Sequence, residues 1–283
     1  MTKIKAPVNI PVSQLHPFEG HPFKVLDNEE MNSLIESIQA QGILSPLIVR
    51  PLENTENEYE IVSGHRRFHA AQKAGLEKVP AFIYALDRDA AAIALVDSNL
   101  HREHILPSEK AFAYRMKYEA MRHQGTSRQV GTKSRTDEQI AENADDSARQ
   151  IQRYISLTNL IPEILELMDE GKIAFTVGVE LSYLDEKSQR DVYEICQSND
   201  CTPSFSQSCR LHKDFNEGEL TQETITAVLS EEKANQRETI KIPIEKLKGR
   251  IPDSIPAKER EDYVLKALDY YNRYRQRQRE HER

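Results

Sequence analysis

The stretch of the sequence best equipped to bind an anion is SGHRRFHAAQKAG, which follows the short apolar run EIV. Gly64 is expected where a strand turns into a helix, and a glycine there lets the backbone approach a ligand closely. The first turn of that helix offers unpaired N–H groups and the positive end of the helix dipole. Arg66 and Arg67 add two guanidinium groups, whose planar shape suits phosphate oxygens. The pattern favours a polyphosphate site, and the competing interpretation is a solvated arginine pair on a surface helix.

A second segment supplies groups that would complete such a site. The run DSNLHR, residues 97–102, ends a predicted helix. The amide of Asn99 is able to hydrogen-bond a phosphate or to hold a metal-bound water, and Arg102 adds a third guanidinium group. We therefore expect Arg66, Arg67 and Arg102 to converge on one anionic ligand.

A third motif has chemistry suited to reading a base sequence. The run TDEQIAENADDSARQIQRYISLTNL, residues 136–160, has the layout of a helix-turn-helix, with helices expected over 137–143 and 147–157. The start of the second helix faces base edges in such motifs, where arginine pairs with guanine and glutamine with adenine. The residues predicted to face bases are Ser147, Ala148, Arg149, Gln150 and Arg153. Those predicted to contact phosphates are Ser156, Thr158, Arg128 and Lys133. The competing interpretation is two helices of an ordinary bundle.

The first hundred residues alternate strand-like and helix-like runs, which predicts a compact α/β module around the first candidate site. Short apolar or β-branched runs predict strands at 9–12, 47–50, 59–62 and 79–84. Apolar residues at helical spacing predict helices at 27–39, 65–74 and 89–99. The polar run ENTENE between two of the strands is typical of a hairpin loop.

Beyond residue 107 the pattern becomes helical. A helix is expected over 108–123, then a basic loop over 125–135, then further helices as far as residue 234. A weak strand pattern at 239–244 precedes a long helix over 259–279. The predicted fold class is α+β and multi-domain. Its parts are a small α/β domain at 1–106, an all-α helix-turn-helix domain at 107–235 and a helical C-terminal segment at 236–283.

Composition bounds the compartment and the partners. The formal net charge is −8, yet basic residues gather in 115–135 and in the final run YYNRYRQRQREHER. Such local patches matter more than the total, because salt screens charges beyond roughly 8–10 Å. No stretch approaches the roughly 20 apolar residues of a membrane-spanning helix, and the first residues lack the apolar core of a signal peptide. We expect a cytoplasmic protein with no membrane partner.

The spacing of Cys196, Cys201 and Cys209 fits no common zinc pattern.

The long helix predicted at 259–279 has two interpretations. An aromatic and aliphatic face includes Tyr271 and Tyr274, and arginines follow it to the end of the chain. One interpretation is a dimerising helix with a basic tail that adds non-specific affinity for DNA. The other is a helix that folds back on its own chain. We favour the first.

Three stretches in order, GILSPLIVR, SGHRRFHAA and SNLHREHILPSEKA, resemble the signature of the ParB N-terminal nucleotide-binding domain. The helix-turn-helix and its continuation LIPEILELMDEGKIAF resemble the central DNA-binding domain of that family, so the resemblance spans residues 9–184. It implies binding of CTP with magnesium, closure into a clamp around DNA, and slow CTP hydrolysis. It carries the nucleotide site over to Gly64, His65, Arg66, Arg67, Ser98, Asn99 and Arg102, and it places Asn99 at the magnesium ion.

Two positions depart from the family's pattern. His65 stands where the middle motif commonly has glutamate, and Ser98 stands where the third motif begins with glutamate, although Asp97 is adjacent. A carboxylate is the natural ligand of magnesium. The departures therefore leave open whether the nucleotide is hydrolysed or only bound.

The leading hypothesis is a sequence-specific DNA-binding partition protein of a plasmid, mobile element or chromosome, with a CTP-type nucleotide switch. It predicts double-stranded DNA with a palindromic site, a homodimer, association with the nucleoid, and a partition ATPase as a further partner. One alternative is an enzyme that hydrolyses nucleotides or transfers phosphate in the same pocket, with His65 or Asp97 handling the proton. The other is a helix-turn-helix transcriptional regulator whose N-terminal module is only structural.

Overall fold

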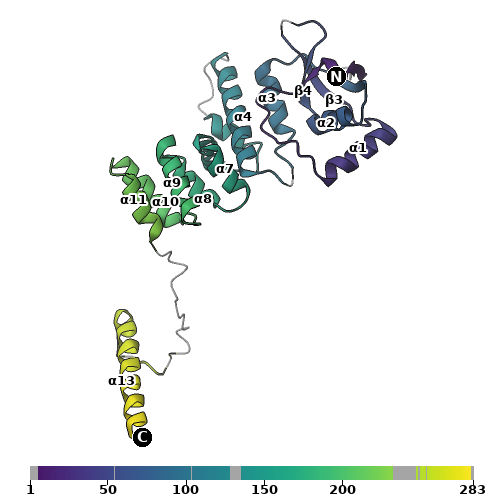
Figure 1. The fold of residues 1–283 in the computed structure, drawn as a ribbon. Helices are drawn as coiled ribbons and strands as arrows, with labels where there is room; N and C mark the ends of the chain where they lie inside the picture. The colour runs from purple at the N-terminus through teal and green to yellow at the C-terminus, as the bar shows by residue number, and fades with distance from the viewer. Residues whose placement is uncertain are drawn as a thin grey trace. The chain divides into compact units, whose positions relative to one another are not determined.

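The computed structural model describes residues 6–53, 55–102, 104–127, 135–231, 247, 249–252 and 254–281. Internal contacts divide the chain into two compact units, Met1–Glu231 and Glu232–Arg283 (Figure 1). The boundary predicted near residue 106 falls inside the first unit, so it stays a prediction. No helix of the described residues is long and apolar enough to cross a membrane.

The first unit begins with a five-stranded sheet of order β1-β5-β3-β4-β2. Its strands are β1 (Val8–Pro11), β2 (Leu15–His16), β3 (Leu47–Pro51), β4 (Tyr59–Ser63) and β5 (Lys78–Ile83). β3 and β4 pair antiparallel, which confirms the predicted hairpin, while β3 pairs with β5 in parallel. The four predicted strands are all present. β2 has only two residues and gave no periodic signal in the sequence.

Three helices accompany this sheet: α1 (Glu29–Gln41), α2 (His65–Lys73) and α3 (Arg88–Asp97). α2 and α3 pack on its two faces. Neighbouring residues of a strand point to opposite faces, so Ile61 and Val62 of β4 enter different cores. Ile61 packs with Phe68 of α2, and Val62 packs with Leu95 of α3. α1 lies against α2, where Met31 and its neighbours form a smaller apolar cluster.

The rest of the first unit is helical, as predicted. Its helices are α4 (Pro107–Ser127), α5 (Thr136–Ala141), α6 (Ala148–Ser156), α7 (Pro162–Asp169), α8 (Phe175–Leu181), α9 (Glu186–Ser198), α10 (Phe205–Asn216) and α11 (Gln222–Ser230). One large apolar cluster joins α7 to α11, and a second joins α4, α5 and α6. The prediction that the loop begins at Gly125 was wrong, since α4 continues to Ser127. A single glycine costs a helix only about 1 kcal/mol relative to alanine, which α4 tolerates at its end.

In the second unit, the long helix predicted at 259–279 is confirmed as α13 (Arg260–His281). Tyr270, Tyr271 and Tyr274 are exposed on it. The strand predicted at 239–244 lies outside the described residues.

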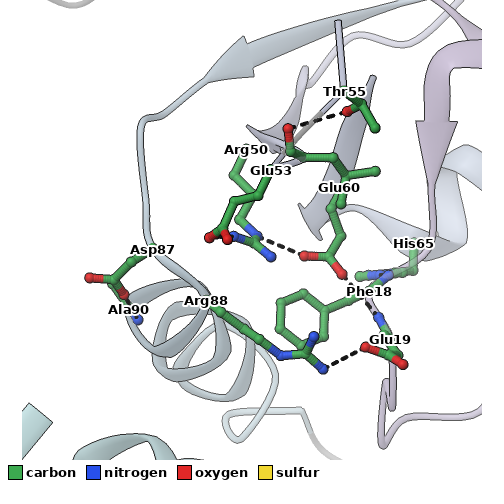
Figure 2. A network of polar contacts seen from close by, with 11 residues as sticks. Phe18, Glu19, Arg50, Glu53, Thr55, Glu60, His65, Asp87, Arg88 and Ala90 are labelled. Atoms are coloured by element: carbon green, nitrogen blue, oxygen red, sulfur yellow. Dashed lines mark hydrogen bonds and ion pairs between the residues drawn. The ribbon is translucent and has the colours of Figure 1, made fainter. Parts of the chain in front are cut away.

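A buried ion pair fastens the hairpin to the loop that follows β2 (Figure 2). Arg50 Nε of β3 lies 2.7 Å from Glu60 Oε2 of β4, and both side chains are buried. The other oxygen of Glu60 accepts a hydrogen bond from the backbone N–H of Glu19, 3.1 Å away. Glu53 is 3.9 Å from Arg50, beyond hydrogen-bonding distance, and its side chain is 77% exposed. Glu60 is therefore the group that neutralises Arg50 inside the protein.

Replacing Glu60 with alanine should lower the free energy of unfolding by about 3–5 kcal/mol, because it leaves a buried guanidinium without its counter-charge. The matched control is Glu53→Ala, which removes the exposed carboxylate near the same arginine and should cost at most about 1 kcal/mol. Urea unfolding followed by circular dichroism measures both values. Equal losses in the two variants would contradict this account of the pair.

Candidate functional site

Gly64 sets the geometry of the turn from β4 into α2. It is the N-cap residue of α2, with φ 106° and ψ 23°, in the left-handed region that favours glycine. A Cβ at this position would lie 3.1 Å from Leu47 and 3.2 Å from the guanidinium of Arg67. The tight turn leaves the first backbone N–H groups of α2 without partners inside the helix. This confirms the predicted strand–glycine–helix arrangement.

The two arginines that follow do not act as a pair. Arg66 lies at the surface, where its Nη2 is 3.0 Å from Glu30 Oε2 of α1. Arg67 is half-buried and donates to the carbonyl oxygens of Ser45 and Pro46, just before β3. Burial lowers the pKa of Arg67. Arg67 thus fastens α2 to the neighbouring loop, while Arg66 keeps an exposed and exchangeable partner.

Arg102 instead joins a cluster that the sequence did not reveal. Its guanidinium carbon lies 5.4 Å from the centre of the Phe23 ring. The rings of His21 and His65 are 3.8 Å apart, and His21 also meets the edge of Phe23. Burial, and then the charge of Arg66, lower the pKa of Arg102. We call His21, His65, Arg66 and Arg102 the imidazole–guanidinium cluster.

The pKa values of both imidazoles of this cluster are lowered. Burial, then the electrostatic interactions with His21 and Arg102, lower the pKa of His65 to about 3. Burial is also the largest cause that lowers the pKa of His21. The Nε2 of His65 accepts a hydrogen bond from the backbone N–H of Phe18 at 3.3 Å. The Nε2 of His21 is buried and has no hydrogen-bond partner among the described residues.

Ser98 and Asn99 end α3 and bond to their own helix. Asn99 is buried, and its Nδ2 donates to the Leu95 carbonyl oxygen at 2.7 Å and to Ser98 Oγ at 3.2 Å. Ser98 Oγ in turn donates to the same carbonyl oxygen. The two residues therefore shape the segment that presents Arg102. The carbonyl oxygen of Asn99 accepts from the backbone N–H of Arg102 at 3.2 Å. Among the described residues, no hydrogen bond or ion pair joins the side chain of Ser98 or Asn99 to an imidazole or guanidinium of the cluster.

The residues present do not fit a magnesium site at Asn99. Magnesium in nucleotide sites takes one or two carboxylates, and the candidate carboxylates already have partners. Asp97 pairs with Lys117, and Glu30 pairs with Arg66. The two oxygens of Glu109 accept from the backbone N–H groups of residues 24 and 106. Over the described part of the chain, no group of three acidic, histidine or cysteine side chains is placed to hold a metal ion.

The helix-turn-helix is formed by α5 and α6, packed on α4. Ile140 of α5 and Ile151 of α6 share an apolar cluster with Tyr114 of α4. The carboxylate of Asp146 in the turn faces α4, since it accepts from the Tyr114 hydroxyl and pairs with Lys110, each at 2.6 Å. Burial, with the carboxylate of Asp146 adding to it, raises the pKa of Tyr114. Asp146 is therefore paired inside the protein and does not oppose an incoming phosphate, while Asp145 beside it is exposed.

A groove of about 790 Å³ lies beside α6. Its lining includes one face of α6 with three- and four-residue spacing: Arg149, Gln152, Arg153 and Ser156. α4 contributes Arg115, Tyr118 and Arg122. We call these seven residues the arginine groove. The residues from α4 were not among the predicted contacts, although the basic run 115–135 was the signal that could have found them.

Only some of the residues predicted to contact DNA line this groove. Arg149 and Arg153 line the groove, as do Ser156 and Thr158. Ser147 is the N-cap of α6, where its Oγ accepts from the backbone N–H of Gln150 at 3.3 Å. Neither Ser147 nor Gln150 lines the groove. Arg128 and Lys133, the other predicted phosphate contacts, lie outside the described residues.

Parts of the chain are similar in sequence to known proteins. Residues 2–100 match the family model of the ParB N-terminal domain. The chain is 35% identical over 167 residues to the chromosome-partitioning protein Spo0J of Thermus thermophilus, covering 59% of this chain and 56% of that protein. It is 32% identical over 183 residues to the nucleoid occlusion protein of Geobacillus thermodenitrificans, covering 64% of this chain and 60% of that protein. The chain thus spans less than two thirds of the length of these relatives.

A solved structure also aligns with much of the chain. It is C-terminally truncated ParB from Caulobacter crescentus complexed to the centromeric parS site. It has a TM-score of 0.43 and 23% identity, and it covers 78% of this chain and 98% of that one. Residues 2–100 are therefore similar to the ParB N-terminal domain. The similarity to chromosome-partitioning and nucleoid occlusion proteins extends over 167 and 183 residues.

Proposed function

We propose that this chain is a sequence-specific DNA-binding partition protein whose N-terminal module binds a nucleoside triphosphate. The observation that carries the DNA part is that arginines of two helices, α4 and α6, line the same groove beside a helix-turn-helix. The chromosome-partitioning and nucleoid occlusion relatives support the same role. Four arginines and two glutamates, Glu119 and Glu180, line the groove, so it has a local excess of positive charge although the net charge of the chain is −8.

The two sides of the arginine groove have different parts in this proposal. Arg149 is exposed in the first turn of α6, the position from which a recognition helix contacts base edges. Arg153, one turn on, stacks over the ring of Phe175 at 5.2 Å, which limits the orientations of its guanidinium. Arg115 and Arg122 of α4 are suited to phosphates, which fix the register of a protein on DNA without reading sequence.

The imidazole–guanidinium cluster supports the nucleotide part. Arg66 and Arg102 come from two separate segments beside the open N-terminus of α2, where a triphosphate finds guanidinium groups and free backbone N–H groups together. CTP is the nucleotide that the family resemblance implies. Magnesium is not part of the proposal, because the candidate carboxylates are already engaged. Hydrolysis is not part of it either, since Asp97 is paired and His65 is a neutral acceptor.

The loop of residues 17–24 gives the two sites a physical connection. At its start, the backbone N–H of Phe18 is bound by His65. At its end, the backbone N–H of Lys24 is bound by Glu109 of α4 at 2.7 Å, and its side chain pairs with Asp169 of α7. A ligand that breaks the hydrogen bond between His65 and Phe18 would move the loop, and with it the contacts of Lys24 with α4 and α7. We therefore propose that this loop links nucleotide binding to DNA binding.

The remaining parts of the proposal concern partners and place. α13 exposes three tyrosines on a long helix, which suits pairing with a second copy of the chain. A twofold homodimer matches a palindromic double-stranded DNA site. Association with the nucleoid in the cytoplasm, and with a partition ATPase, follows from the role in partition.

Arg149→Ala should reduce affinity for the specific DNA site by roughly 5- to 150-fold, because a bidentate arginine–guanine contact is worth about 1–3 kcal/mol. Arg122→Ala should weaken specific and random DNA alike and lower the salt dependence by about one ion. The site is first selected from a random duplex pool, and affinities are measured by fluorescence anisotropy at several salt concentrations. The control is Arg190→Ala, an exposed arginine of α9 that pairs with Glu186 away from the groove. Equal affinity of the wild type for selected and random duplexes would remove specific recognition.

Titration calorimetry with CTP, ATP, GTP and UTP tests the nucleotide site. At least one triphosphate should bind, and Arg102→Ala should weaken it by roughly 10- to 100-fold, the value of a hydrogen bond to a charged group. Lys73→Ala is the matched control, since it removes a cation from the other end of α2, where Lys73 pairs with Asp27. Failure of all four triphosphates to bind, or equal loss in both variants, would contradict a site at this cluster.

A further inference from the structure

The imidazole–guanidinium cluster brings together four nitrogen-containing side chains, and no carboxylate of the described residues hydrogen-bonds to either imidazole. His21 and His65 stack at 3.8 Å, and the charge of Arg102 acts on both rings. The charge of Arg66 acts on Arg102 in turn. Without a ligand, burial and the nearby guanidinium groups lower the pKa values of both imidazoles. A bound polyanion would raise these pKa values, because an opposite charge within about 4–6 Å favours the protonated form of histidine.

The charged groups on every neighbouring element support this conclusion. On β4, both oxygens of Glu60 are taken by Arg50 and by the Glu19 backbone. On α4, both oxygens of Glu109 are taken by backbone N–H groups. On α1, Glu30 pairs with Arg66. Glu19, in the loop itself, pairs with Arg88. None of these carboxylates hydrogen-bonds to an imidazole, although the charge of Glu109 acts on Arg102. A polyanion bound at the cluster would therefore bring the nearest counter-charge to a proton on His21.

The two histidines differ in their readiness to accept that proton. The Nε2 of His65 already accepts from the backbone of Phe18, so protonating it would break that hydrogen bond. The Nε2 of His21 is buried without any partner among the described residues. A buried nitrogen without a partner costs free energy until it is bonded. Protonation beside a phosphate oxygen would turn this nitrogen into a charge-assisted donor.

We propose that His21 is a proton-linked ligand of the polyphosphate, so that a proton taken up on its Nε2 supplies positive charge that magnesium supplies in other nucleotide sites. The proton comes from solvent and stays on the imidazole while the anion is bound, and no covalent bond changes. This inference rests on the proposed triphosphate site. It goes beyond it by naming the residue and the charge that accompany the ligand.

The sign of the pH dependence follows from the pKa of His21. That pKa is lowered from its usual value in the free protein, chiefly by burial, and the bound anion raises it. Between these two values the complex holds one proton more than the free protein. Affinity therefore increases as pH falls through the pKa of the complex, by up to about tenfold per pH unit for one linked proton. The terminal phosphate titrates near pH 6, so measurements from pH 7 to 8.5 separate the two effects.

The experiment is titration calorimetry of the full chain with CTP, with EDTA and separately with magnesium, at several pH values from 7 to 8.5. Paired buffers with different ionisation enthalpies give the number of protons taken up. Inorganic tripolyphosphate as a second ligand distinguishes recognition of the phosphates from recognition of the base. We expect binding to persist in EDTA, uptake approaching one proton, and tighter binding at lower pH. His21→Gln should abolish the uptake and flatten the pH dependence, while His69→Gln, on α2 and paired with Asp27, should leave both unchanged.

A second measurement does not depend on a folded variant. The imidazole signals of His21 in the wild-type protein, followed by nuclear magnetic resonance, should show a higher pKa with CTP than without it. Binding that requires magnesium, takes up no proton or leaves the His21 pKa unmoved overturns the inference while the triphosphate site stands. Binding of neither CTP nor tripolyphosphate under any condition overturns the proposed site itself.

Discussion

The loop of residues 17–24 depends on hydrogen bonds to its backbone from side chains far away in the sequence. His65 and Glu60 bind the N–H groups of Phe18 and Glu19 at one end, and Glu109 binds that of Lys24 at the other. Phe18 is buried, and a buried N–H without a partner costs about 1–3 kcal/mol, so His65 restricts where the start of the loop can lie. The loop brings His21 and Phe23 against Arg102. The candidate nucleotide site exists in this form because the loop is held there.

The same contacts join two kinds of structure. Glu60 can hold the loop only because Arg50 neutralises it within the sheet. Asp169 of α7 pairs with Lys24 and also accepts from the backbone and hydroxyl of Ser108, in the first turn of α4. A carboxylate at that end of a helix is favoured by the helix dipole. The α/β module and the first helix beyond it, α4, are therefore linked through ionisable groups, as the proposed coupling to a charged ligand requires.

Local signals in the sequence were enough to predict most of the elements. Gly64 after an apolar run predicted the turn into α2, and the helix expected over 147–157 is present as α6, because such signals act within one turn of the backbone. The family motifs located Arg66 and Arg102. The stacking of His21 on His65 was not predictable, since it joins residues 44 positions apart through tertiary packing. The hydrogen bonds from Arg67 to the carbonyl oxygens of Ser45 and Pro46 were not predictable either, because they depend on where β3 begins.

Hydrogen exchange measured by mass spectrometry, with and without CTP, tests most directly whether the loop joins the two sites. The account predicts altered exchange in peptides that cover residues 16–25 and 104–112 as well as in the peptide around Gly64. Such a pattern would mean that ligand binding at α2 changes the hydrogen bonds of Phe18 and Lys24 together. Changes confined to residues 63–69, with the other two segments unaffected by saturating CTP, would contradict it.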